Sequence, residues 1–259
     1  EVISPSECKK IVSSGDIPDA RMCHTFTNVS GSAYAIGGRS RPGKEFSSID
    51  RFDFSSSKWT RVGDIGKKIS RHATVLLSDD ELLIFHGGEF ILYSTRNNTS
   101  HRLQISSRSS DISILHSGGM TFHDGIGYII GGSTCEVTPT VSNKIYSFQL
   151  NDEKTEVILE EVAQGPEYAV IGSKVEVYGE HLYIVPSTNL HEVVDYVLRV
   201  PLQGPKTAEK IKLNEMLVGF GLVVSNNRLE MVGGGGVCYS FGSYFNFITT
   251  LEMLQEMGS

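Results

Sequence analysis

The stretch "SAYAIGG", residues 32–38, decides the fold, because a short β-rich run ends there in the glycine pair Gly37-Gly38. The same pattern closes "ELLIFHGG" at Gly87-Gly88, "GIGYIIGG" at Gly131-Gly132 and "NRLEMVGG" at Gly233-Gly234. The pairs are separated by 50 residues (37 to 87), 44 residues (87 to 131) and 102 residues (131 to 233). Midway through the longest gap, "EHLYIVPS" ends at Ser187 with the pair lost. The spacing predicts five repeats, each one supersecondary unit.

Each repeat contains further strand-like segments around the glycine pair. A polar-to-apolar run precedes the pair, as in "SRHATVLL" from Ser70, and an alternating run follows the loop after it, as in "SIDRFDF" from Ser48. "KWTRV" from Lys58 completes four strands in the first repeat. Four short strands at steady spacing predict an all-β β-propeller, in which glycine ends a strand at a crowded backbone position.

The two ends of the chain complement each other. Residues 8–21 have the pattern of a last strand plus a linker, and the repeat from Leu217 shows only three strands. The N-terminal strand can supply the fourth and remove a free sheet edge. We therefore expect a single domain over residues 1–259, an all-β propeller of five blades closed by the N-terminal strand.

The repeats resemble the kelch family over nearly the whole chain. The resemblance is carried by Tyr34, Trp59, Arg71-His72, His116 and the glycine pairs. Trp59 is the only tryptophan, and the fourth repeat lacks its glycines, so this chain departs from the regular pattern. His24, His72 and His116 recur at one position of the repeat. This recurrence predicts a structural role, in hydrogen bonds between blades.

Composition limits the possible partners and compartments. The net charge of −7 argues against bulk electrostatic binding of nucleic acid but leaves a local basic patch open. The four cysteines lack CxxC spacing, so no metal site is expected, and free thiols are favoured over disulfides. No apolar run reaches membrane-spanning length, and we expect a cytoplasmic protein without a membrane partner. Because the chain begins at Glu1, we expect it to be a segment of a longer protein.

No catalytic motif is present. The chain has no GxSxG, no HExxH and no P-loop lysine, so no catalytic residue and no cofactor site is assigned to this segment. The paired carboxylates Asp79-Asp80, Asp152-Glu153 and Glu160-Glu161 fit a solvated surface.

The loop after the first glycine pair, "GGRSRPGK", is the main binding candidate. Arg39, Arg41 and Lys44 fall within six positions on a variable loop, where propellers carry function. They predict either an anion-binding patch for RNA phosphate or an ordinary polar loop. Arg96, Arg102 and Arg108 form a second, weaker basic run.

The last glycine run, "MVGGGGVCYSFGSYFN" at residues 231–246, does not fit a nucleotide loop. Neither register completes GxGxxG, no helix follows, and Cys238 has no base or cation nearby in sequence. The segment resembles instead the last kelch repeat of the tRNA wybutosine-synthesizing protein 4 family. The matching residues are Gly233 to Gly236, Cys238, Tyr239, Phe241, Gly242 and Asn246, supported by "YAIGGR" at 34–39 and "RHA" at 71–73.

This resemblance implies a parent enzyme with an upstream methyltransferase domain that uses S-adenosylmethionine. It would methylate and methoxycarbonylate the modified guanosine beside the anticodon of phenylalanine tRNA. The propeller would bind that tRNA or the adjacent methyltransferase domain, with candidate contacts at Arg39, Arg41, Lys44, Cys238, Tyr239, Ser240 and Asn246. The alternative is a kelch protein-binding adaptor, such as a substrate receptor of a ubiquitin ligase. A stand-alone propeller enzyme lacks its required arginine cluster, Tyr-Glu pair or metal ligands.

Overall fold

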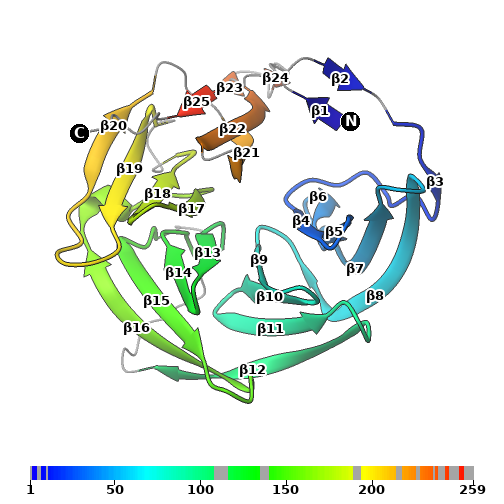
Figure 1. Ribbon diagram of the computed structural model, residues 1–259, viewed down its shortest axis with the longest axis horizontal. Coiled ribbons are helices and arrows are strands. Elements are labelled where there is room, and N and C mark those ends of the chain that lie inside the picture. The colour runs from blue at the N-terminus through cyan, green and yellow to red at the C-terminus, as the bar shows by residue number, and fades with distance from the viewer. Residues whose placement is uncertain are drawn as a thin grey trace. The chain divides into compact units, whose positions relative to one another are not determined.

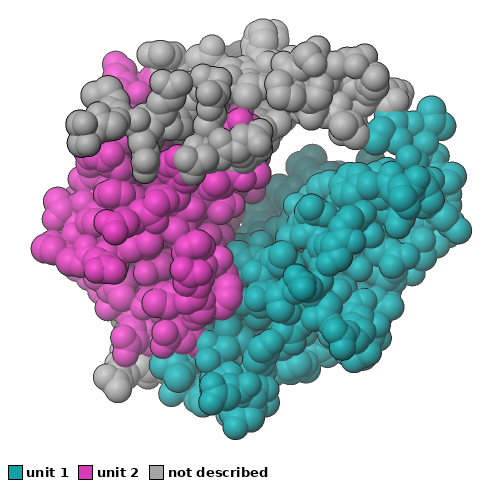
Figure 2. All heavy atoms as spheres, in the orientation of Figure 1, with its two compact units in different colours: residues 1–116, 150–158 teal, residues 117–149, 159–259 magenta. Residues whose placement is uncertain are grey.

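The computed structural model describes two compact units of this chain. Unit 1 comprises Glu1–His116 with Leu150–Ile158, and unit 2 comprises Ser117–Gln149 with Leu159–Ser259 (Figure 2). The described residues are 2–4, 7–9, 11–107, 116–134, 140–188, 194–213, 218–225, 228–235, 237–238, 243–244 and 251–253. In these segments no helix is both long and apolar enough to cross a membrane.

Unit 1 contains two antiparallel four-stranded sheets (Figure 1). The first has the order β4-β5-β7-β8, and the second has the order β9-β10-β11-β12. Short strand β3 pairs in parallel with the outer strand β8, β6 pairs with the start of β7, and β1 pairs with β2. The strands are β1 Val2–Ser4, β2 Glu7–Lys9, β3 Ser14–Gly15, β4 Thr25–Val29, β5 Ser32–Ile36, β6 Arg39–Arg41, β7 Lys44–Asp53, β8 Lys58–Ile69, β9 Ala73–Ser78, β10 Glu81–His86, β11 Glu89–Ser94 and β12 Thr99–Ser107.

Unit 2 repeats the same antiparallel meander. The sheet orders are β13-β14-β15-β16, β17-β18-β19-β20 and β21-β22-β25, with β23 paired to β24. A single 3₁₀ turn, η1 Pro166–Tyr168, precedes β17. The strands are β13 Gly119–His123, β14 Ile126–Ile130, β15 Lys144–Leu150, β16 Glu156–Gln164, β17 Lys174–Tyr178, β18 His181–Val185, β19 Tyr196–Pro201, β20 Glu209–Lys212, β21 Val218–Ser225, β22 Arg228–Gly235, β23 Val237–Cys238, β24 Ser243–Tyr244 and β25 Leu251–Met253.

The second strand is deeply buried in each of the first four repeats. All five residues of β5 are buried, and so are the four central residues of β10 and the last four of β14 and β18. A strand covered on both faces reads as a continuous apolar run rather than an alternating one. In unit 1, Tyr34 and Ile36 of β5 pack with Leu82 and Ile84 of β10 in one core.

The glycine pair ends this buried strand where the next repeat approaches. The amide of Gly38 donates to the carbonyl of Ile69 at 2.8 Å, and the amide of Gly132 donates to the carbonyl of Val170 at 2.8 Å. A Cβ on Gly37 would lie 2.6 Å from the Ile69 carbonyl oxygen, and φ at Gly37 is +56°. Both the close approach and the left-handed backbone therefore require glycine, as the sequence predicts.

Several sequence expectations can be compared with these strands. The fourth repeat keeps its second strand as β18, and the pair is replaced by Pro186-Ser187, where the Ser187 hydroxyl donates to the Gly172 carbonyl at 2.9 Å. The C-terminal segment contains the short strand β25. Within the described pairings β1 contacts β2, so closure by the N-terminal strand, the count of five blades and a single 1–259 domain stay predictions.

Candidate nucleic-acid interface

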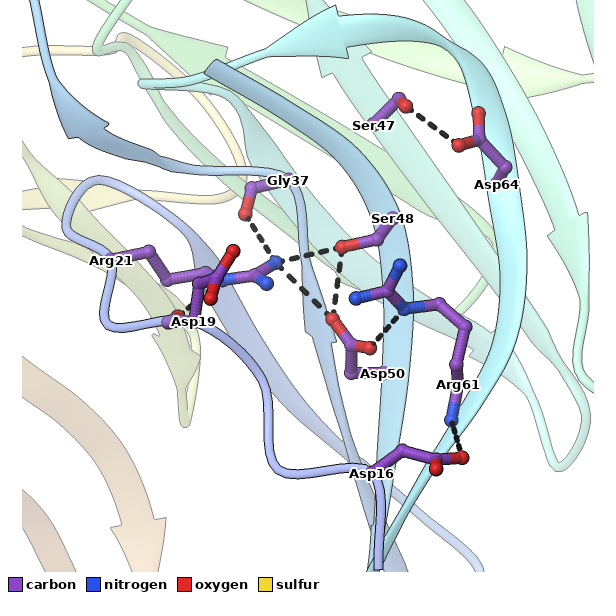
Figure 3. A network of polar contacts seen from close by, with 9 residues as sticks. All are labelled: Asp16, Asp19, Arg21, Gly37, Ser47, Ser48, Asp50, Arg61 and Asp64. Atoms are coloured by element: carbon purple, nitrogen blue, oxygen red, sulfur yellow. Dashed lines mark hydrogen bonds and ion pairs between the residues drawn. The ribbon is translucent and has the colours of Figure 1, made fainter. Parts of the chain in front are cut away.

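A buried ion pair fixes the base of the loop that follows the first glycine pair (Figure 3). The Arg21 guanidinium lies 3.2 Å from the Asp50 carboxylate, with 4% of the arginine side chain and none of the aspartate side chain exposed. Nη1 of Arg21 also donates to the Gly37 carbonyl at 3.1 Å and to the Ser48 hydroxyl at 2.9 Å. Arg21 therefore ties the linker before β4 to the glycine pair and to β7.

A second arginine reaches the same carboxylate from the outer strand. Nε of Arg61, on β8, lies 2.5 Å from Asp50, while more than half of the Arg61 side chain is exposed. Desolvation lowers the pKa of Arg21, and the charge of Asp50 opposes this. Because Asp50 balances a buried cation, its loss would leave a charge in the core. No sequence motif marks this network, since Arg21 and Asp50 are 29 positions apart.

The predicted binding loop is a β-hairpin that rests on this base. Strand β6 pairs with the start of β7, opposing Arg39 to Glu45 and Arg41 to Lys44 around Pro42-Gly43. Backbone hydrogen bonds between Met22 and Arg39, at 2.8 and 2.9 Å, hold its other edge. The side chains of Arg41 and Lys44 are exposed and that of Arg39 is half-buried. The structure thus presents Arg41 and Lys44 to solvent on a supported hairpin.

The hairpin lies at one end of unit 1, where the glycine pairs of β5 and β10 also lie. We call the basic side chains of this end the basic rim: Arg39, Arg41, Lys44, Lys67, Lys68, Arg71 and Arg102. They outnumber the acidic side chains placed there, which are Asp19, Glu45, Asp64 and Glu89. Lys67 donates to Glu89 at 2.7 Å, and Arg102 lies 3.5 Å from the same carboxylate. Sequence reasoning missed Lys67, Lys68 and Arg71, because strand register and not chain proximity brings them to the hairpin.

The opposite end of unit 1, formed by the other turns, has the reverse balance. Its acidic residues are Asp53, Asp79, Asp80, Glu81, Asp152 and Glu153, and its basic residues are Lys58, Arg96 and Lys154. Two of these cations are paired, since Arg96 lies 2.7 Å from Asp80 and Lys154 contacts Glu81. Unit 1 therefore carries a positive end and a negative end within a chain of net charge −7.

The second basic run predicted from the sequence is divided between the two ends of unit 1. Arg102 lies beside Glu89 at the basic rim, whereas Arg96 pairs with Asp80 at the opposite end. Arg108 lies outside the described residues. The prediction of one basic run is therefore wrong for Arg96 and Arg102, because Arg96 lies in the turn before β12 and Arg102 lies farther along that strand, toward the other end of the sheet.

The recurring histidines are not all equivalent. His24 and His72 each follow a residue with positive φ, Cys23 and Arg71, but His116 precedes the corresponding residue, Ser117. The prediction of one shared position is therefore wrong for His116. His72 is buried, and its Nε2 hydrogen-bonds the Thr25 hydroxyl at 3.0 Å, so β4 and β9 are joined as expected of a structural histidine.

His116 contacts His86 instead. The two imidazole centroids are 4.6 Å apart and the ring planes meet at 74°. Desolvation is the main cause that lowers the pKa of His86 to about 4, and His116 and Lys67 lower it further. Desolvation also lowers the pKa of His116, followed by the charge of Arg71. Both side chains are half-buried.

The remaining candidates fall outside what the structure describes. Tyr239, Ser240 and Asn246 are not among the described residues, and for Cys238 the backbone strand β23 is described but not the side chain. Cys23 is a free, exposed thiol. Across the described side chains, no group of three or more His, Cys, Asp or Glu could hold a metal ion.

Comparisons with known proteins agree with the repeat architecture. Residues 18–248 match the family model described as "tRNA wybutosine-synthesizing protein 4, beta-propeller". The chain resembles proteins named tRNA wybutosine-synthesizing protein 4 from Candida albicans and Saccharomyces cerevisiae. The first is 35% identical over 94% of this chain and the second 29% identical over 91%. The chain spans 39% and 37% of the lengths of these two relatives.

A solved structure shows the same fold at low sequence identity. The structure of YjhT superposes with a TM-score of 0.70 and 9% identity, covering 89% of this chain and 80% of that one. With the family match and the repeated four-stranded sheets, it confirms the predicted all-β propeller. The chain belongs to the β-propeller family of tRNA wybutosine-synthesizing protein 4.

Proposed function

We propose that this chain is the propeller module of a tRNA wybutosine-synthesis enzyme and that its basic rim contacts the anticodon arm of phenylalanine tRNA. The observation that carries the proposal is the difference in charge between the two ends of unit 1. Basic side chains predominate at the glycine-pair end, although the chain as a whole is acidic. Cations that neutralise phosphates release condensed counterions, which is the main sequence-independent source of RNA affinity. The names of the family and its relatives are consistent with a tRNA substrate.

The rest of the activity follows from the family resemblance and is part of the same proposal. The parent enzyme would use S-adenosylmethionine, bound in a separate methyltransferase domain, to methylate and methoxycarbonylate the modified guanosine. This propeller would hold the cytoplasmic tRNA for that domain. Cys238, Tyr239, Ser240 and Asn246 remain candidate contacts on the last repeat.

Neutralising the exposed cations of the rim is expected to weaken RNA binding. Arg41, Lys44 and Lys68 are exposed and have no ion pair among the described residues. The triple variant Arg41→Gln, Lys44→Gln, Lys68→Gln should bind the anticodon stem-loop about tenfold more weakly, because it loses phosphate contacts. The slope of log Kd against log salt should fall by about 2–3, roughly one per contact. Fluorescence anisotropy at several salt concentrations measures both quantities.

The opposite end supplies a control with the same change in net charge. Lys58→Gln, Arg96→Gln, Lys154→Gln removes three cations from the acidic end of the same unit. This variant should bind within about twofold of the native chain and keep its salt slope. Equal losses in the two triple variants would refute a localised interface, and unchanged binding in the rim variant would favour a protein partner for this surface.

A further inference from the structure

The paired imidazoles of His86 and His116 lie beside the basic rim, and within the described residues neither makes a side-chain hydrogen bond like that of His72 to Thr25. His86 is the last residue of β10, and His116 lies three residues before β13. Nδ1 of His86 is buried and lacks a hydrogen-bond partner among the described residues. An added proton on His86 would therefore lack an acceptor, so His116 is the better site for one.

The charged groups that act on the pair from the described residues are two cations and two carboxylates. The groups that act on it are Lys67 on β8, Arg71 in the turn before β9, Glu45 on β7 and Glu89 on β11. Glu45 already accepts the Ser70 hydroxyl. Glu89 is held by Lys67, whose hydrogen bond lowers the pKa of that carboxyl. Glu89 is thus paired with Lys67, whereas the charge of Glu45 favours a proton on either ring and the charges of Lys67 and Arg71 disfavour one.

We propose that His116 is a phosphate-binding residue of the basic rim and takes up a proton when RNA binds, with neutral His86 packed beside it. This inference rests on the proposed function, because it needs an RNA phosphate at the rim. The phosphate adds a negative charge beside the ring, and a charge-assisted hydrogen bond from the imidazolium to a phosphate oxygen is stronger than one from a neutral ring. The proton comes from solvent, and no bond between heavy atoms changes.

The pH dependence has a definite sign. In the free chain the pKa of His116 is lowered, so the ring is neutral at pH 7.5. A bound phosphate raises that pKa, so binding takes up a proton between the two values. Affinity therefore rises as the pH falls through this window and levels off below the pKa of the free chain. One proton can change Kd by at most about tenfold per pH unit.

The experiment compares the anticodon stem-loop affinity at pH 7.5 and pH 5.5 by anisotropy. We expect native Kd to fall about five- to tenfold, and His116→Gln to retain at most about a twofold change. His101→Gln removes an exposed histidine from β12 of the same sheet and should keep the native pH response. A full native response in His116→Gln would overturn the proposal. Absence of RNA binding at every pH would refute the proposed function and this inference together, whereas loss of only the pH response leaves the proposed function standing.

A second measurement uses the native chain and does not depend on how a variant folds. NMR titration of the His116 ring proton should show its pKa rising by about one unit or more when the stem-loop RNA is added. An equal rise with the same concentration of inorganic phosphate would assign the site to free phosphate and overturn its assignment to RNA. No rise with either anion would contradict phosphate binding at His116.

Discussion

The Asp50→Ala variant is expected to lose about 3–5 kcal/mol of unfolding free energy, because the buried Arg21 guanidinium would keep its charge without a partner. Asp50 is fully buried and joins Arg21, Ser48 and Arg61 in one network (Figure 3). Arg21 also holds the Gly37 carbonyl, so the loss should loosen the hairpin that carries Arg41. Urea unfolding followed by circular dichroism measures the change.

Two further variants separate the buried pair from the exposed one. Arg61→Ala removes a partner whose side chain is 56% exposed, and Asp50 keeps its contact with Arg21, so the loss should be well below that of Asp50→Ala. The double variant Arg21→Met, Asp50→Leu should recover most of the loss, because it leaves no uncompensated charge. Similar losses for Asp50→Ala and Arg61→Ala would show that burial of the pair is not what makes it important.

The Gly37→Ala variant should also be destabilised, by about 2–5 kcal/mol. A Cβ there would lie 2.6 Å from the Ile69 carbonyl oxygen and 2.9 Å from Ile69 Cγ1. Overpacking of this kind costs about 1–3 kcal/mol and a left-handed alanine about 1–2 kcal/mol more. Because the clash is with backbone, side-chain rearrangement cannot relieve it. The urea midpoint of the variant reports the loss.

Gly43→Ala is the matched control for this prediction. Gly43 lies in the same unit, has φ of +77° and has no atom within 4 Å of a Cβ built on it. Its replacement by alanine should therefore lower the unfolding free energy only by the cost of a left-handed backbone, about 1–2 kcal/mol. If Gly37→Ala and Gly43→Ala proved equally stable, the close approach between the first two repeats would not explain the glycine pair.

The fold could be predicted from the sequence because the same pattern of a buried strand and a turn recurs along the chain. "ELLIFHGG" and "GIGYIIGG" align by their glycines, and even "EHLYIVPS" could be placed as a second strand after its pair was lost. These features are local, since a buried strand and a left-handed turn are specified within about eight residues. The same locality explains why Arg41 and Lys44 were found as a candidate surface.

The rest of the site depends on strand register and on packing between segments distant in sequence, so no short sequence motif predicts it. Lys67 and Lys68 reach the rim because β8 runs twelve residues beside β7, and Phe46 pairs with Ile69. His116 looked equivalent to His72 in sequence, but the left-handed residue falls before one and after the other. The Arg21–Asp50 pair likewise forms only when the linker folds back onto β7.

Cross-linking of the anticodon stem-loop to the native chain tests the central claim most directly. RNA carrying photoreactive groups along its backbone would be irradiated in the complex, and the linked peptides identified by mass spectrometry. We predict cross-links to residues 39–44, 67–71 and 102, which make up the basic rim. Cross-links concentrated instead at residues 53–58, 79–81 and 95–98, at the acidic end, would contradict the claim that the rim is the RNA interface.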